Sequence, residues 1–159
     1  MAERTPTMNP PYLLLIPRLY LGLIFTIAAV EKLTGRGDFA RPLTGFLTQV
    51  GLRSGYGWYH AVLRSVVLPH VHVFATLVIS AECFVAVSML FGLATRAGAA
   101  VAIFLLVNYL AAKGVPWWSP ASNDMAEIVL AVVVLIGAAG RFGGIDMKLH
   151  ERFPRIPLW

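Results

Sequence analysis

The residue best suited to chemistry is Glu82, a carboxylate in the middle of a long apolar stretch. An ionised side chain at the centre of a membrane-spanning helix costs about 2.5–3.5 kcal/mol on insertion scales. Glu82 therefore has to face the protein interior, carry a proton, or have a polar partner. In such a place a carboxylate can accept a proton or hold a polar ligand group by hydrogen bonds.

If the apolar stretches form helices that cross a membrane, three more polar side chains lie at a membrane depth close to that of Glu82. At about 1.5 Å per residue, Asn108 falls level with Glu82, and Tyr109 lies close to that level. Arg18 lies about a turn and a half away and reaches Glu82 only with an extended side chain. One interpretation is a proton or ligand site in which Asn108 and Tyr109 supply hydrogen bonds. The other is a buried clasp, Glu82 with Asn108 or Arg18, that fixes helix register.

Histidines and cysteines give little support for a metal site. His70 and His72 project about 200° apart on a helix and cannot share one metal. A single axial bond from either histidine to a haem or chlorophyll at the membrane surface stays open as an alternative. Cys83 is the one cysteine, which excludes an intramolecular disulfide and a multi-cysteine cluster. We therefore predict no metal site.

Charged residues at the ends of the apolar stretches are interpreted as interface charges. Exposed ion pairs near water contribute little and need no functional explanation. One such group holds Glu31, Lys32, Lys113, Asp124 and Glu127, and the opposite end holds Arg96, Arg141 and Asp146.

Composition indicates that apolar helices position all these residues. Of 159 residues, 58% are hydrophobic and 13% are charged, whereas soluble domains carry about a quarter charged residues. The sequence therefore predicts an all-α integral membrane four-helix bundle that forms one membrane domain over residues 1–159. A helix needs roughly twenty residues to cross a hydrocarbon core, and each predicted span is close to that length. The spans cover about 12–33, 70–93, 96–113 and 122–140, with a short tail at 141–159.

The connection at about 38–68 is much longer than the turns between the other predicted spans. Its apolar residues recur at helical spacing, which predicts a short amphipathic helix on the membrane surface. Those residues are Phe39, Leu43, Phe46, Leu47 and Val50. Aromatic residues of this connection and the last one are expected to form one interfacial belt. They are Tyr56, Trp58, Tyr59, Trp117 and Trp118.

The net charge of +5 does not indicate nucleic acid, because the basic residues form no cluster. Basic groups that flank spans more often meet anionic lipid head groups. Lysine and arginine are evenly divided between the two sides, so charge alone does not orient the chain.

Several short motifs resemble the DoxX family of small four-helix membrane proteins, which includes a subunit of thiosulfate:quinone oxidoreductase. Their order and spacing extend over nearly the whole chain. The motifs are Arg18–Phe25, Glu31–Leu33, Ala81–Glu82, Leu90–Arg96, Gly140–Arg141 and Ile145–Asp146.

The resemblance implies a bacterial or archaeal-type cytoplasmic membrane, with both termini cytoplasmic, and association with redox systems that use quinone. We expect a non-catalytic subunit of a respiratory or photosynthetic electron-transfer complex that stabilises the assembly or shapes a quinone or lipid pocket. Its partners would be other membrane protein subunits and lipids. The candidate quinone contacts are Glu82, Asn108, Tyr109 and Arg18.

Two alternatives stay open. The chain could form the quinone site of an oxidoreductase of the thiosulfate:quinone type, with Glu82 handling protons. It could instead be a small carrier or proton path, although no inverted repeat is evident. No recognisable catalytic motif is present.

Overall fold

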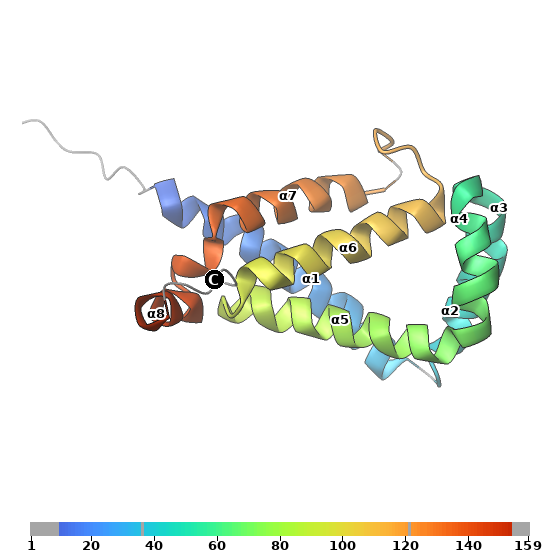
Figure 1. Cartoon of the computed structure of the whole chain (residues 1–159), viewed down its shortest axis with the longest axis horizontal. Helices are drawn as coiled ribbons and strands as arrows, with labels where there is room; N and C mark the ends of the chain where they lie inside the picture. The colour runs from blue at the N-terminus through green and yellow to red at the C-terminus, as the bar shows by residue number, and fades with distance from the viewer. Residues whose placement is uncertain (1–9, 36, 121, 154–159) are drawn as a thin grey trace, which may run out of the picture.

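The computed structural model describes residues 10–35, 37–120 and 122–153, and every regular element among them is helical (Figure 1). The all-α prediction is thus confirmed for the described part of the chain. Within it, three helices are long and apolar enough to cross a membrane: Tyr12–Thr34, Gly57–Phe91 and Thr95–Lys113.

Four helices pack around a common core (Figure 1). They are α1 (Leu15–Thr34), α5 (Val71–Phe91), α6 (Thr95–Lys113) and α7 (Asp124–Gly137). Helix α1 contacts α5, α5 contacts α6, α6 contacts α7, and α7 returns to α1. The core mixes large side chains with alanines, and such small residues let membrane helices approach closely. It includes Leu21, Phe25, Val85, Met89, Ala99, Ala102 and Val134.

The last of these helices is shorter than the predicted span at 122–140. Helix α7 has 14 residues, which at about 1.5 Å per residue is well short of a hydrocarbon core roughly 30 Å thick. It ends because Ala138 adopts a left-handed backbone with φ 46°, a conformation that cannot continue a right-handed helix. A short 3-10 helix, η5 (Ala139–Arg141), follows.

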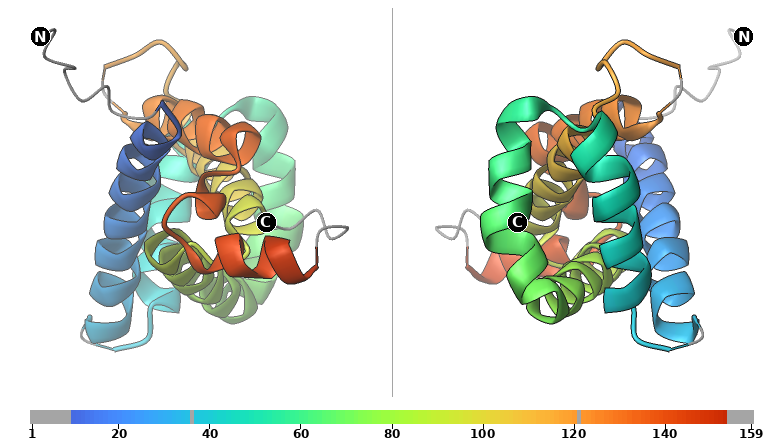
Figure 2. Two further views of the ribbon diagram at one scale, coloured as in Figure 1. Left: turned by 90° about the vertical axis from the view of Figure 1, so that its left-hand side faces the viewer. Right: turned by 90° about the vertical axis from the view of Figure 1, so that its right-hand side faces the viewer.

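The long connection forms two helical arms, which we call the helical cap (residues 40–70). One arm holds α2 (Ala40–Phe46), η2 (Leu47–Gly51) and α3 (Leu52–Ser54). The other holds α4 (Gly57–Val62), η3 (Leu63–Val67) and η4 (Leu68–His70). The cap lies across the ends of α5 and α6, and the two arms stand side by side in the end-on view (Figure 2, right).

The structure is helical where the amphipathic helix was predicted, and it adds a second helical arm to this connection. Leu47 of the first arm packs against Leu63 and Val67 of the second, so the apolar face of the first arm contacts its own chain. The second arm was not expected at all. It continues into α5 through η4, which contains Pro69, and proline cannot donate a helical hydrogen bond. Figure 1 shows the chain turning between this arm and α5.

The turn between the arms is fixed to the end of α6. The backbone N–H of Tyr56 donates to the carbonyl of Ala111 at 3.1 Å, and the Tyr56 hydroxyl donates to that of Val115 at 3.2 Å. Gly55 lies so close to this helix end that a Cβ there would meet the Ala112 carbonyl oxygen at 2.9 Å. Only glycine fits here without displacing the cap from α6.

At the opposite end of the molecule, α8 (Ile145–Arg152) folds back on the turn between α5 and α6. Asp146, which was interpreted as an interface charge, is fully buried there. Its carboxylate accepts hydrogen bonds from the backbone N–H groups of Ala94 at 2.6 Å and Thr95 at 2.8 Å. Asp146 therefore caps the N-terminus of α6 from a distant part of the chain, where a negative charge complements the helix dipole.

Candidate functional site

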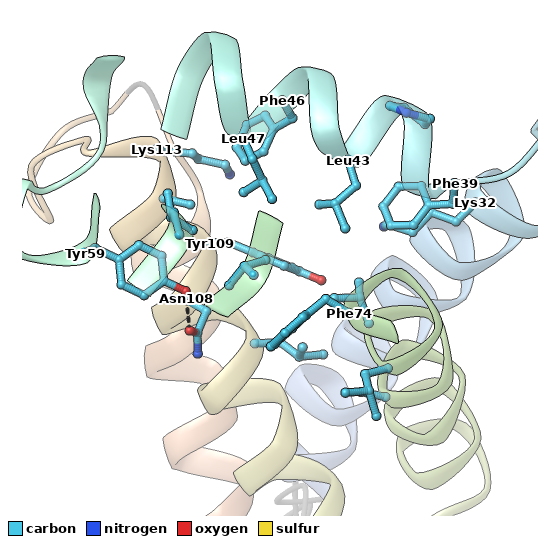
Figure 3. A pocket seen from close by; sticks show the side chains of 18 of the residues that line it. Lys32, Phe39, Leu43, Phe46, Leu47, Tyr59, Phe74, Asn108, Tyr109 and Lys113 are labelled. Carbon is cyan, nitrogen blue, oxygen red and sulfur yellow. Dashed lines mark hydrogen bonds between the residues drawn. The ribbon is translucent and has the colours of Figure 1, made fainter. Parts of the chain in front are cut away.

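A cavity of about 710 Å³ lies between the helical cap and the bundle (Figure 3). Its walls are almost entirely apolar. Leu43, Phe46 and Leu47 line it from the cap, and Phe74, Leu77 and Phe104 line it from α5 and α6. The cap contributes part of its π-helical turns, η2 and η3, a feature that is frequent at functional sites.

Five polar side chains also reach this cavity. They are Lys32 from α1, Tyr59 from the cap, and Asn108, Tyr109 and Lys113 from α6. A small number of placed polar groups in an apolar cavity is typical of sites for small molecules and cofactors.

Glu82 lies directly behind two of these groups. Its side chain is 1% exposed and does not line the cavity. The Lys32 ammonium lies 2.8 Å from each of the Glu82 carboxylate oxygens, and the Tyr109 hydroxyl donates to Oε1 at 2.7 Å. Figure 3 shows the Tyr109 hydroxyl directed toward Lys32. The carboxylate thus orients an ammonium and a hydroxyl that both face the cavity, and its own charge is neutralised.

The structure brings together part of the predicted polar group. Tyr109 contacts Glu82 as its depth suggested, whereas neither Asn108 nor Arg18 contacts it, so the predicted clasp partners are wrong. Lys32, interpreted as an interface charge, is the actual partner. The last turn of α1 packs against the middle of α5, and a lysine can direct its long stem inward from there.

Asn108 has a different role at the other side of the cavity. Its Oδ1 accepts a hydrogen bond from the Tyr59 hydroxyl at 2.6 Å, while its Nδ2 donates to the carbonyl of Phe104 at 2.7 Å (Figure 3). This bond links the second arm of the cap to α6. Tyr59 therefore faces inward instead of joining the predicted belt, whereas Trp58 and Trp118 remain 69% and 71% exposed.

A second ion pair closes the end of the cavity near the turn after α6. The Lys113 ammonium lies 2.9 Å from both carboxylate oxygens of Asp124, and the Ser122 hydroxyl donates to the same carboxylate at 2.7 Å. This pair joins α6 to the first turn of α7. Asp124 is buried, so loss of Lys113 would leave an uncompensated buried charge, which is not the case for an exposed interface charge.

Arg18 lies at the opposite end of the molecule and is not part of this site. Its guanidinium Nη1 donates to the carbonyls of Ala139 at 3.0 Å and Phe142 at 3.1 Å. The side chain is buried, so it ties α1 to the segment that follows α7. Its role here is to hold the fold together.

The histidines singled out by the sequence also lie outside the cavity. His70 Nδ1 is 3.0 Å from the carbonyl of Val66, and His72 Nδ1 is 2.8 Å from an Asp38 carboxylate oxygen. Both are exposed side chains. No group of three or more His, Cys, Asp or Glu residues is placed to hold a metal within residues 10–35, 37–120 and 122–153.

A comparison with family models finds a match to DoxX over residues 13–113. The matched segment contains α1, the helical cap, α5 and α6, and therefore every residue that lines the cavity. It agrees with the resemblance seen in the sequence motifs. No curated protein and no solved structure matches the chain.

Proposed function

Because the chain belongs to the DoxX family of membrane proteins, we propose that it binds a quinone beneath the helical cap, as a subunit of a larger membrane redox complex. The observation that carries the proposal is the apolar cavity with an ammonium and a phenol at one place on its wall. A quinone needs an apolar space for its ring and chain and hydrogen-bond donors for its carbonyl oxygens.

Each candidate contact has a defined part in this proposal. Lys32 donates to an oxygen atom of the ligand. The Tyr109 hydroxyl donates its one proton to Glu82, so it faces the ligand as an acceptor and helps to hold the Glu82–Lys32 pair in place. Tyr59 and Asn108 hold the cap against α6 and so keep the cavity closed on that side. The bound quinone itself would supply the capacity to take up electrons and protons.

A second role follows from the same contacts, in which the chain forms the working quinone site of an oxidoreductase. Glu82 is buried, and within the described part of the chain its ion pair and side-chain hydrogen bond are made with two cavity-lining residues, Lys32 and Tyr109. A proton that moves between Glu82 and the ligand would therefore pass along the Tyr109 hydroxyl or the Lys32 ammonium. In this role Glu82→Gln abolishes quinone-linked turnover, whereas a purely structural subunit keeps it.

The proposal includes a membrane arrangement. Helices α1, α5, α6 and the shorter α7 form the membrane-embedded bundle, with both termini on the cytoplasmic side. The cap then lies near the opposite face, where Trp58, Trp117 and Trp118 present exposed rings. Aromatic residues are enriched at that depth of a bilayer.

Purification from native membranes in gentle detergent tests the proposal. We expect redox subunits to co-purify in fixed stoichiometry and about one quinone per chain to be extracted with solvent. A control preparation of the Lys32→Met and Glu82→Gln double variant, which removes the ammonium together with the charge that it neutralises, should retain the subunits and lose the quinone. Wild-type chain that purifies alone and without quinone contradicts the proposal.

A further inference from the structure

Two exposed side chains mark an opening in the wall of the cavity. Leu77 of α5 and Phe104 of α6 both line the cavity, yet they are 56% and 67% exposed. Leu47, Leu63 and Leu105 line it as buried residues. The cavity is therefore covered by the cap and open along the flank where α5 and α6 adjoin.

This opening faces the hydrocarbon side of the protein. Phe104 lies near the middle of α6 (Thr95–Lys113), one of the helices long and apolar enough to cross a membrane. The neighbouring side chains Val73 and Val107 are also apolar and exposed, at 57% and 47%. An exposed apolar flank at mid-depth of a spanning helix contacts lipid acyl chains, not water.

The polar and apolar parts of the cavity are separated along its length. Its two charged groups come from helix ends, since Lys32 is in the last turn of α1 and Lys113 in the last turn of α6, and Lys32 and Tyr109 lie beneath the cap (Figure 3). The opening is lined by the apolar side chains of Leu77 and Phe104. A ligand with a polar head and a long apolar tail matches this division, with its tail toward the opening. A compact water-soluble ligand would leave the opening unfilled.

We propose that the ligand enters sideways from the bilayer between α5 and α6, and that its hydrocarbon tail remains in the opening between Leu77 and Phe104. This inference rests on the proposed function and narrows it to quinones that carry a long hydrocarbon chain. A third exposed residue that lines the cavity, Pro42, belongs to the cap. It marks the alternative route, by which a ligand would enter from the cap side.

Photolabelling of the protein in lipid nanodiscs tests the route. The probe is a benzoquinone with a decyl chain that ends in a diazirine, and adducts are located by mass spectrometry after irradiation. We expect adducts on α5 and α6 near Leu77 and Phe104, which disappear when excess unlabelled decyl benzoquinone is added. Phospholipid is already in large excess in the nanodisc and would displace a probe that bound only through its hydrocarbon chain. Labelling that is lost when the unlabelled quinone is added therefore indicates a site that selects the quinone head.

The outcomes separate this inference from the function on which it rests. Competed adducts confined to the cap near Pro42 would overturn sideways entry and leave quinone binding intact. Adducts that do not respond to the competitor would overturn both.

A pair of substitutions gives a second measurement. Phe104→Trp enlarges a side chain at the opening, and Val107→Trp enlarges an exposed neighbour that does not line the cavity. We expect Phe104→Trp to reduce competed labelling about tenfold, because the larger ring takes up space that the tail would occupy, and Val107→Trp to leave it within about twofold. Equal effects of the two variants would overturn the proposed opening.

Discussion

The ammonium group of Lys32 lies 2.8 Å from both carboxylate oxygens of Glu82 and joins the last turn of α1 to the middle of α5. The two members of the pair are unequal, because the Glu82 side chain is 1% exposed whereas that of Lys32 is 21% exposed. The loss of stability therefore depends on which member of the pair is removed.

Lys32→Met should destabilise the protein more than Glu82→Gln. Without its lysine the buried carboxylate is an uncompensated charge, which costs about 3–5 kcal/mol. Without its glutamate, Lys32 can extend toward water or lipid head groups. Denaturation in mixed detergent micelles would measure both variants, and the double variant should recover much of the lost stability. A larger loss for Glu82→Gln would contradict this assignment of the pair.

Tyr109→Phe should weaken quinone binding while the fold is retained. The substitution removes the hydroxyl that helps to hold Glu82, and through it Lys32, at the cavity wall, and such a hydrogen bond to a charged acceptor contributes about 1.5–3 kcal/mol. We expect the dissociation constant for a decyl benzoquinone to rise about tenfold.

Tyr56→Phe is the matched control for that measurement, because the Tyr56 hydroxyl bonds to the Val115 carbonyl and the residue does not line the cavity. It should leave the dissociation constant unchanged. The same rise in both variants would show that the cavity wall has simply loosened.

Tyr59→Phe should release the second arm of the cap from α6. The hydroxyl of Tyr59 bonds to Asn108 at 2.6 Å across the cavity, and loss of a typical hydrogen bond costs about 1 kcal/mol. Hydrogen exchange should accelerate in residues 57–70 and stay unchanged in α7. Trp58→Phe, at an exposed position of the same helix, should leave exchange in the cap as it is in the wild type.

Asp146→Ala should lower stability by about 2 kcal/mol, because the backbone N–H groups of Ala94 and Thr95 at the start of α6 lose their acceptor. Quinone binding should persist, since Asp146 lies at the opposite end of the molecule from the cavity. Glu151→Ala is the control, because Glu151 is an exposed carboxylate on the same helix, α8. Equal losses in the two variants would argue against the capping role.

The sequence predicted the long helices well because hydrophobic length and helix-ending residues are local signals. The predicted span at 70–93 corresponds to α5 (Val71–Phe91), and that at 96–113 corresponds to α6 (Thr95–Lys113). Gly92 adopts φ 62° in the turn between them, a conformation that glycine accepts without strain. The contact of Glu82 with Tyr109 also followed from counting residues along two adjacent antiparallel helices.

The composition and motifs of the sequence thus determined the helical class and the membrane family, and they singled out Glu82, which the structure buries. Only the tertiary structure decided that Lys32 is its partner, that Asn108 serves the cap, and that Asp146 caps α6. These contacts depend on how far α1 is offset along α5 and on how the cap and α8 fold back. Such offsets are set by the packing of side chains from distant segments, and a periodicity read along one helix carries no information about them.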